Sequence, residues 1–218
     1  MTGGSRSAVD EILGARLVPV LRSPSAEAAV ETGRALADGG LNVVELTFST
    51  PDVGTAIAAL ARSPSIVVGA GTVLAPAQAE LAVEAGARFL VSPVNPPWLV
   101  PLAHVLGVPA VPGAATPSEV WDAHLTGAPL VKLFPIARLG GAPYVKDLRA
   151  VMPQVRVMAT GGVSVRSARE LLDAGCAAVG LGSIHSDESL GPDPTRRARA
   201  AVALVGTGEP LTHEASRP

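Results

Sequence analysis

VVELTFSTPDVGTAIAALAR, residues 43–62, decides the fold class of this chain. Its first six residues, 43–48, are mostly β-branched or apolar, which is typical of a strand. The triplet Thr50-Pro51-Asp52 then places capping side chains beside a proline, which is a helix-start signal. The alanine-rich run 52–62 has helical character. The stretch therefore predicts one strand followed by one helix.

The same unit recurs along the whole chain. Short apolar runs predict strands at residues 16–22, 43–48, 66–73, 88–93, 110–113, 130–135, 156–161 and 178–182. Ala-rich segments between them predict helices at residues 25–38, 52–62, 76–85, 96–106, 117–126, 143–151, 165–174 and 194–205. Eight such units, repeating at roughly 20–27 residues, predict an α/β fold of the (β/α)8 TIM-barrel type.

An open doubly wound sheet is the main alternative fold. That fold should carry a Gly-x-Gly-x-x-Gly turn after its first strand. Here the turn reads Leu21-Arg22-Ser23-Pro24, so the barrel is favoured. No linker or low-complexity stretch divides the chain. We expect a single barrel domain over residues 1–218, with loose ends at about 1–8 and 209–218.

The composition is that of a globular protein with a large core. Apolar residues make up 48% of the chain and aromatic residues 3%, so Ala, Val and Leu must build the core. The net charge of −2 offers no field for nucleic acid. No apolar run approaches the ~20 residues of a membrane span. The single cysteine, Cys176, excludes an internal disulfide and a thiolate cluster. We expect a cytoplasmic protein that binds neither nucleic acid nor membranes.

Lys132 is the first candidate for covalent chemistry. The chain has 15 arginines and only 2 lysines, yet Lys132 lies inside the apolar run LVKLFP at 130–135. Arg would hold a charge in a buried strand as well as Lys, but it stays protonated and cannot act as an amine nucleophile. A desolvated lysine can lose its proton and form a Schiff base with a carbonyl. The second lysine, Lys146, has charged neighbours on a predicted helix and is expected at the surface.

Glu45 is the candidate general acid/base. It interrupts the apolar run 43–48, where burial favours the protonated carboxyl and so suits proton transfer near neutral pH. A buried Glu–Lys ion pair that only fills the barrel is the alternative. Schiff-base formation needs an amine and one group that shuttles protons, so Lys132 and Glu45 together favour the catalytic interpretation.

Glycines follow the last two predicted strands. They lie in Thr160-Gly161-Gly162 and in the segment 180–183, GLGS. The loops after strands seven and eight of such barrels often bind phosphate through bare backbone N–H groups. Tight turns would explain one such cluster, but two clusters in the two expected loops predict a phosphate site.

Two further side chains are predicted at the mouth of the barrel. Arg22 closes the first strand on the same face as Val18 and Val20. Its guanidinium could clamp a carboxylate or a phosphate, and a salt bridge to a neighbouring loop is the alternative. Thr72 follows the small residues 69–71 and offers a hydroxyl where a ligand can approach the backbone.

No metal or other cofactor is predicted. Cys176, among small residues, is expected to pack as a small hydrophobe, and His185 is expected only at the rim of the site. No carboxylates or histidines share adjacent strand ends. The histidines lack metal-ligand spacing; they are His104, His124, His185 and His213.

A series of motifs runs in order along the chain and resembles one known family. The motifs are VELT at 44–47, GAGTVL at 69–74, SP at 92–93, PG at 112–113, TPSE at 116–119, VKLFP at 131–135, ATGGV at 159–163 and GLGS at 180–183. The series resembles the class I 2-keto-3-deoxy-6-phosphogluconate (KDPG) and 4-hydroxy-2-oxoglutarate aldolase family, from about Ile12 to Val205. The resemblance implies a trimeric (β/α)8 barrel that cleaves a 2-oxo-4-hydroxy acid into pyruvate and an aldehyde without a metal.

The resemblance also implies a role for each residue at the pyruvate end of the site. Lys132 would form the Schiff base and Glu45 would shuttle protons. Thr72 would bind the pyruvate carboxylate, whereas Pro93 and Phe134 would line the pyruvate pocket.

At the other end, Gly161, Gly162 and Ser183 would hold the phosphate. One departure concerns the substrate. The best-known branch of the family has an arginine where this chain has Ser49, and an apolar residue where this chain has Arg22. A second branch, which includes aldolases acting on the galactonate epimer, carries its arginine at the end of strand one, as here. The expected substrate is therefore KDPG, its galactonate epimer or 4-hydroxy-2-oxoglutarate, which give glyceraldehyde 3-phosphate or glyoxylate beside pyruvate.

Two alternative functions stay open at this point. The chain could be a phosphate-binding barrel isomerase or epimerase, in which Lys132 and Glu45 form an ion pair or an acid/base couple. It could also be a barrel that binds a phosphorylated metabolite without catalysis. Trapping with pyruvate and borohydride separates them, because only the aldolase predicts a stable covalent adduct.

Overall fold

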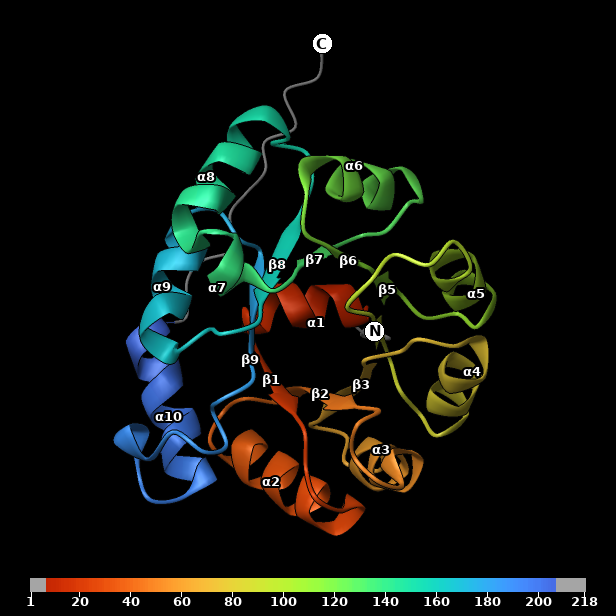
Figure 1. The fold of residues 1–218 in the computed structure, drawn as a ribbon. Helices are drawn as coiled ribbons and strands as arrows, with labels where there is room; N and C mark the ends of the chain where they lie inside the picture. The colour runs from red at the N-terminus through yellow and green to blue at the C-terminus, as the bar shows by residue number, and fades with distance from the viewer. Residues whose placement is uncertain (1–6, 207–218) are drawn as a thin grey trace, which may run out of the picture.

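The computed structural model describes residues 7–206, and these residues form a barrel of parallel strands surrounded by helices (Figure 1). The strands are β1 (Leu17–Leu21), β2 (Val43–Thr47), β3 (Val67–Gly71), β4 (Leu90–Val91), β5 (Ala110–Val111), β6 (Gly113–Ala114), β7 (Val131–Leu133), β8 (Val157–Thr160) and β9 (Ala178–Leu181). Each pairs in parallel with its neighbour in the order β5-β4-β3-β2-β1-β9-β8-β7-β6. The predicted barrel is confirmed.

Strands β5 and β6 are the two halves of the one strand predicted at residues 110–113. Pro112 separates them, and because proline has no backbone N–H it interrupts the ladder. The first half pairs with β4 and the second with β7. The two ends of the sheet order are therefore neighbours in the chain, and they close the ring into eight strand positions.

The helices that follow the strands lie on the outside of the ring. They are α2 (Ala26–Asp38), α3 (Val53–Ala61), α4 (Pro76–Glu84), α5 (Leu99–Val105), α6 (Pro117–Leu125), α8 (Gly141–Val151), α9 (Val165–Asp173) and α10 (Pro194–Val205). Capping hydroxyls start three of them: Ser25, Thr116 and Ser164 each accept a hydrogen bond from a first-turn backbone N–H.

The predicted cap at Thr50-Pro51-Asp52 is wrong. Asp52 precedes α3 in the left-handed region, with φ 49°, and its side chain makes no capping bond. Thr50 instead accepts a hydrogen bond from the Ser23 backbone N–H at 3.1 Å, which ties the loop after β2 to the loop after β1. The prediction failed because the Thr50 hydroxyl oxygen accepts its hydrogen bond from Ser23, 27 positions away in the sequence, and not from the first turn of α3.

Three short elements were not predicted. Helix α7 (Ile136–Leu139) and the 3-10 helix η1 (Glu188–Leu190) lie in loops after strands, and α1 (Ala8–Ala15) precedes β1. The predicted loose ends lie almost entirely outside the described residues. Ser7 and Ala8 are the exception, because Ser7 caps α1 and Ala8 is buried.

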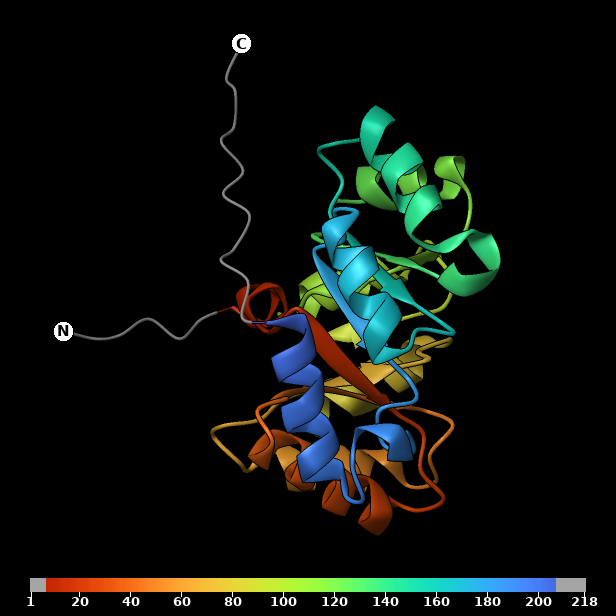
Figure 2. The same ribbon diagram turned by 90° about the vertical axis from the view of Figure 1, so that its left-hand side faces the viewer.

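Helix α1 closes one end of the barrel (Figure 2). Its buried residues Ala8 and Ile12 pack on an apolar layer inside the ring. That layer contains one or two side chains on, or directly before, the strand at each of the eight positions, namely Val18, Val43, Val67, Phe89, Val91, Val111, Leu130, Met158 and Ala178. Side chains alternate along a strand, so the residues two positions further on point into the ring at the next level. Those residues face the opposite end, where the strands finish.

None of the helices within residues 7–206 is long and apolar enough to cross a membrane.

Candidate active site

A cavity of about 700 Å³ is lined by residues at the carboxyl ends of the strands and in the loops that follow them. All the residues that the sequence predicts for the site line this one cavity: Arg22, Glu45, Thr72, Pro93, Lys132, Phe134, Gly161, Gly162 and Ser183. They come from strands or loops on several sides of the ring. The mouth of a (β/α)8 barrel is where side chains from different strands converge, and here it gathers every predicted residue.

Lys132 and Glu45 face each other across the floor of this cavity. Lys132 lies on β7 and Glu45 on β2, on opposite sides of the ring. Lys132 Nζ is 3.7 Å from Glu45 Oε1, and the two side chains are 5% and 0% exposed. This distance exceeds that of a hydrogen bond. The groups therefore neutralise each other's charge, but no hydrogen bond between them locks either one in place.

The Glu45 carboxylate is buried with unused hydrogen-bonding capacity. Neither of its oxygens accepts a hydrogen bond from any residue between 7 and 206. Buried polar atoms are nearly always hydrogen-bonded, and a catalytic role is one explanation for an exception. Gly71 makes room for the carboxylate, because a Cβ there would collide with Glu45 Oε1.

The backbone around Lys132 holds its side chain in one direction. The Lys132 N–H donates to the Pro112 carbonyl at 2.8 Å, and the residue pairs with Gly113 on one side and Met158 on the other. Its Nζ lies 5.4 Å from the centroid of the Phe134 ring, within cation–π distance. The amine is therefore presented from a rigid strand beside an apolar wall.

Thr72 enters the cavity from strained backbone. It follows β3 with φ 58°, in the left-handed region that threonine rarely adopts. Such conformations cost of order 1–3 kcal/mol and cluster at functional sites. The observed strain supports the prediction that the position of Thr72 serves a ligand.

The glycine loops after β8 and β9 form the other side of the cavity. Gly161 and Gly162 have φ of 94° and 72°, which glycine adopts without strain. A Cβ on Gly161 would lie 2.9 Å from Pro135 Cα, so this loop also packs closely on the segment after β7. Ser183 Oγ donates to the Val163 carbonyl at 3.4 Å and joins the two loops.

Helix α9 begins where the first of these loops ends. Its cap, Ser164, lines the cavity and accepts a hydrogen bond from the Ser167 N–H. Free N–H groups of glycine loops, together with the positive end of a helix, suit a phosphate or carboxylate. The phosphate role of these loops stays a prediction.

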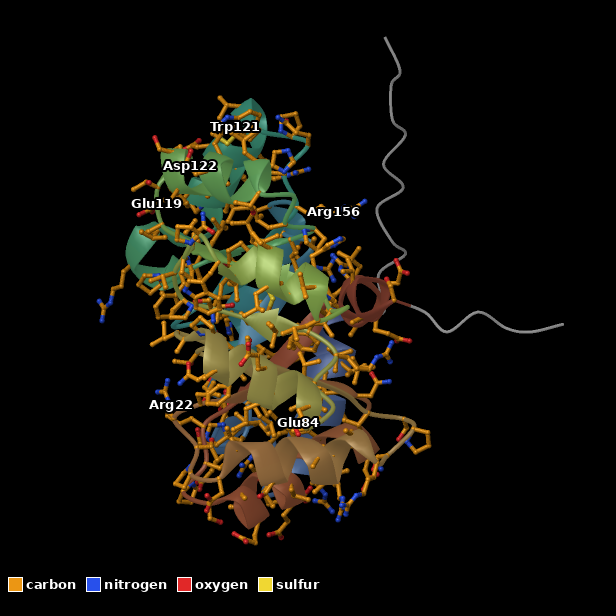
Figure 3. The ribbon with its side chains drawn as sticks, turned by 90° about the vertical axis from the view of Figure 1, so that its right-hand side faces the viewer. Arg22, Glu84, Glu119, Trp121, Asp122 and Arg156 are labelled. Carbon is orange, nitrogen blue, oxygen red and sulfur yellow. The ribbon has the colours of Figure 1, made fainter. Side chains whose placement is uncertain are left out.

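Arg22 lies at the rim, as the strand period predicted. It directly follows β1 and lines the cavity with Val20, whereas Val18 belongs to the apolar layer below. Its side chain is exposed, and Figure 3 shows it on the side of the molecule away from α1. Its Nε donates to Ser49 Oγ at 2.8 Å, so the predicted alternative of a salt bridge to a loop is not what the structure shows.

Sequence reasoning assigned no site role to several cavity residues, among them Thr47 and Thr160. Thr47 lies two positions after Glu45, and Thr160 lies two positions after Met158, so strand period alone could have placed both in the lumen. Thr160 Oγ1 is buried and has no hydrogen-bond partner among the described residues. The hydroxyl of Thr160 is thus a second unused polar group in the cavity wall.

The residues that the sequence analysis discounted, where the structure describes them, do not line the cavity. Cys176 is fully buried in the core, and burial raises the pKa of its thiol to about 12. Burial, together with the nearby Arg197 charge, lowers the pKa of His185. Lys146 is exposed on α8, and His213 lies outside the described residues. Between residues 7 and 206 no group of three or more His, Cys, Asp or Glu side chains could hold a metal ion.

Known proteins share both the sequence pattern and the fold. The family model for KDPG and KHG aldolase matches residues 9–195. The 2-dehydro-3-deoxy-phosphogluconate aldolase of Treponema pallidum is 40% identical over 158 residues, which are 71% of this chain and 74% of the relative. The 2-dehydro-3-deoxy-6-phosphogalactonate aldolase of Escherichia coli is 33% identical over 192 residues, 87% of this chain and 92% of the relative.

A solved structure adds a chemical detail. It is the KDPG aldolase of Legionella pneumophila with pyruvate captured as a covalent carbinolamine intermediate. It aligns with a TM-score of 0.77 at 32% identity and covers 89% of this chain and 94% of its own. On the family match and these relatives, the chain belongs to the KDPG and KHG aldolase family.

Proposed function

We propose that this chain cleaves a 2-oxo-4-hydroxy acid into pyruvate and an aldehyde through a Schiff base on Lys132. The observation that carries the proposal is the pair of Lys132 Nζ and Glu45 Oε1, 3.7 Å apart and buried in the floor of one cavity. The carbinolamine captured in the Legionella relative is the intermediate that such a lysine would form.

The reaction needs one nucleophile and one proton carrier. The neutral Lys132 amine attacks the C2 carbonyl, and loss of water from the carbinolamine leaves an iminium. Removal of the proton from the C4 hydroxyl breaks the C3–C4 bond. The electron pair of the C3–C4 bond moves toward the iminium nitrogen, so an enamine forms and the aldehyde leaves. Protonation at C3 and hydrolysis then release pyruvate and restore the amine.

Glu45 carries the protons in this scheme. Its oxygens are the anionic groups beside Lys132, and they have no competing hydrogen bond among the described residues. A general acid/base must be within reach of the proton that it moves. Glu45 can take the proton from the attacking amine, help water leave, and later serve the C4 hydroxyl and C3 in turn.

The two ends of the substrate have separate places in this proposal. Thr72 binds the carboxylate beside Lys132, and Pro93 and Phe134 enclose the methyl group of pyruvate. The opposite end, a phosphate in KDPG or its galactonate epimer, lies against the glycine loops. Gly161, Gly162 and Ser183 supply backbone N–H donors there.

Reductive trapping tests the covalent step. Incubation with pyruvate and borohydride, followed by peptide mass spectrometry, is expected to place the adduct on Lys132. An isomerase, an epimerase or a binding protein would yield no adduct. Cleavage assays on KDPG, its galactonate epimer and 4-hydroxy-2-oxoglutarate, run side by side, then rank the substrates.

We also propose a cytoplasmic homotrimer, as the family resemblance implies. Large apolar side chains lie exposed on the described surface. Leu74, Val94 and Trp121 are 53%, 49% and 37% exposed, and Figure 3 shows Trp121 on α6. Burial of these apolar side chains between subunits would stabilise a trimer. Light scattering after size exclusion is expected to give the mass of three chains, and the mass of one chain would contradict the proposal.

A further inference from the structure

A chain of three hydrogen bonds connects Arg22 to the end of its own strand. Arg22 Nε donates to Ser49 Oγ at 2.8 Å, Ser49 Oγ lies 2.7 Å from Thr47 Oγ1, and Thr47 Oγ1 donates to the Leu21 carbonyl at 3.1 Å. Leu21 is the last residue of β1 and Arg22 follows it. The chain therefore runs from the guanidinium across to β2 and back to β1.

The direction of each hydrogen bond is fixed by counting hydrogens. The Thr47 hydroxyl has one hydrogen, and that hydrogen goes to the Leu21 carbonyl. The Ser49 hydroxyl must then donate to Thr47, which leaves its lone pairs to accept from Arg22 Nε. All three bonds point the same way, and aligned hydrogen bonds strengthen one another. Ser49 thus acts as an oriented acceptor.

The acceptor has a definite effect on the arginine. An exposed arginine has many rotamers, and immobilising it on binding costs conformational entropy. A bond at Nε fixes the plane of the guanidinium but leaves the outer edge, with both Nη groups, available. Neither Nη nitrogen has a partner within residues 7–206. The edge that remains matches two oxygens of a carboxylate or a phosphate.

We propose that Ser49, oriented by Thr47, is a positioning residue that holds the Nη edge of Arg22 ready for an anionic group of the substrate. The inference rests on the proposed function for the identity of the substrate. It also gives Ser49 a role in this chain. Ser49 is shorter than the arginine that the best-known branch of the family has at this position. In this proposal Ser49 makes no contact with the anion, but it fixes Arg22, which does.

A double-mutant cycle tests the coupling, with wild type, Ser49→Ala, Arg22→Ala and the double variant. The loss of a net hydrogen bond corresponds to about a 3- to 10-fold fall in kcat/KM for Ser49→Ala, carried mainly by KM. In the Arg22→Ala background, Ser49→Ala is expected to change kcat/KM less than about twofold. An equal loss in both backgrounds would overturn the proposal, because Ser49 would then act without Arg22.

Conservative variants separate positioning from a packing role. Ser49→Thr keeps the hydroxyl and is expected to restore most of the lost kcat/KM, whereas Thr47→Val breaks the next link and should show a smaller loss of the same kind. Ser118→Ala is the matched control, since Ser118 is exposed on α6 and lines no part of the cavity. Failure of Ser49→Thr to rescue would contradict a role for the hydroxyl.

The same variants distinguish carboxylate from phosphate and keep the two proposals apart. Pyruvate carries only a carboxylate, so weaker pyruvate trapping in Ser49→Ala assigns the arginine edge to that group. An effect confined to the phosphorylated substrates assigns it to the phosphate. If wild type forms no pyruvate adduct at all, the proposed function fails. If wild type forms the adduct but Ser49→Ala matches wild type with every substrate, only the positioning role fails.

Discussion

The floor and the rim of the cavity are built in different ways. Lys132 and Glu45 lie in the middle of strands, almost fully buried, with directions set by the barrel ladder. The rim is formed by residues in the loops after strands. Arg22 and Ser183 are exposed there, and Gly162 lies in the loop after β8 with a positive φ. Rigid strands give precise placement, and loops can vary without loss of the core. We therefore expect the floor to fix the chemistry and the rim to fix the choice of substrate.

The largest effect is expected from a substitution of the nucleophile in the floor, Lys132. Lys132→Arg is expected to keep the fold and abolish turnover, because arginine preserves the charge beside Glu45 but cannot form the Schiff base. Steady-state kinetics measure the loss of turnover, a thermal unfolding curve checks that the fold is kept, and pyruvate–borohydride trapping tests for the Schiff base. Activity above about a tenth of wild type, a change no larger than one weak interaction gives, would rule out the covalent mechanism.

The next largest effect is expected from a substitution of the proton carrier in the floor, Glu45. Glu45→Gln is nearly isosteric, so we expect slow Schiff-base formation but a loss of roughly 10²–10⁴-fold in proton exchange at the methyl carbon of pyruvate. Deuterium incorporation followed by NMR measures this step. The thermal unfolding curve serves as the control, because the substitution leaves the buried Lys132 without its anionic partner. Unchanged exchange would assign the proton transfers to another group.

How much the sequence predicts differs between floor and rim for physical reasons. Lys132 and Glu45 interrupt apolar runs, and a period of two fixes which face of the strand they occupy. Both signals are local, so the positions of the two floor residues can be predicted from a few neighbouring residues in the sequence. Arg22 was placed correctly by the same period, since it directly follows β1.

What the sequence could not predict depends on contacts between distant residues. Thr50 lost its capping role to a partner 27 positions away, and the bond from Arg22 to Ser49 spans 27 positions as well. The short helix α7 lies after β7, where its Ala137 packs against Gly162. Local periodicity does not predict such contacts, because they form only when the folded strands bring distant residues together.

At the rim, Arg22→Ala is expected to reduce kcat/KM, because the anionic group of the substrate loses its charge-assisted partner. A charge-assisted hydrogen bond contributes ~1.5–3 kcal/mol, so the loss should be about 10- to 150-fold. Kinetics with phosphorylated substrates and with 4-hydroxy-2-oxoglutarate sharpen the comparison. An equal loss on all of them indicates a carboxylate clamp, and a loss that spares 4-hydroxy-2-oxoglutarate indicates a phosphate clamp. Unaltered kinetics on every substrate would contradict a role for Arg22 in binding.

The smallest expected effect tests where the floor ends. Thr160 is the last residue of β8, 5% exposed, with a hydroxyl that has no partner among residues 7–206. Thr160→Val keeps the shape but removes the unsatisfied hydroxyl, so the free energy of unfolding is expected to stay equal or rise by about 1 kcal/mol. If that hydroxyl binds the substrate, kcat/KM should fall about 3- to 10-fold at the same time. Thr160→Ser retains the hydroxyl and should behave as wild type in the kinetic assay. A stability gain with unchanged kinetics would show that the floor ends at Lys132 and that Thr160 belongs to the barrel wall alone.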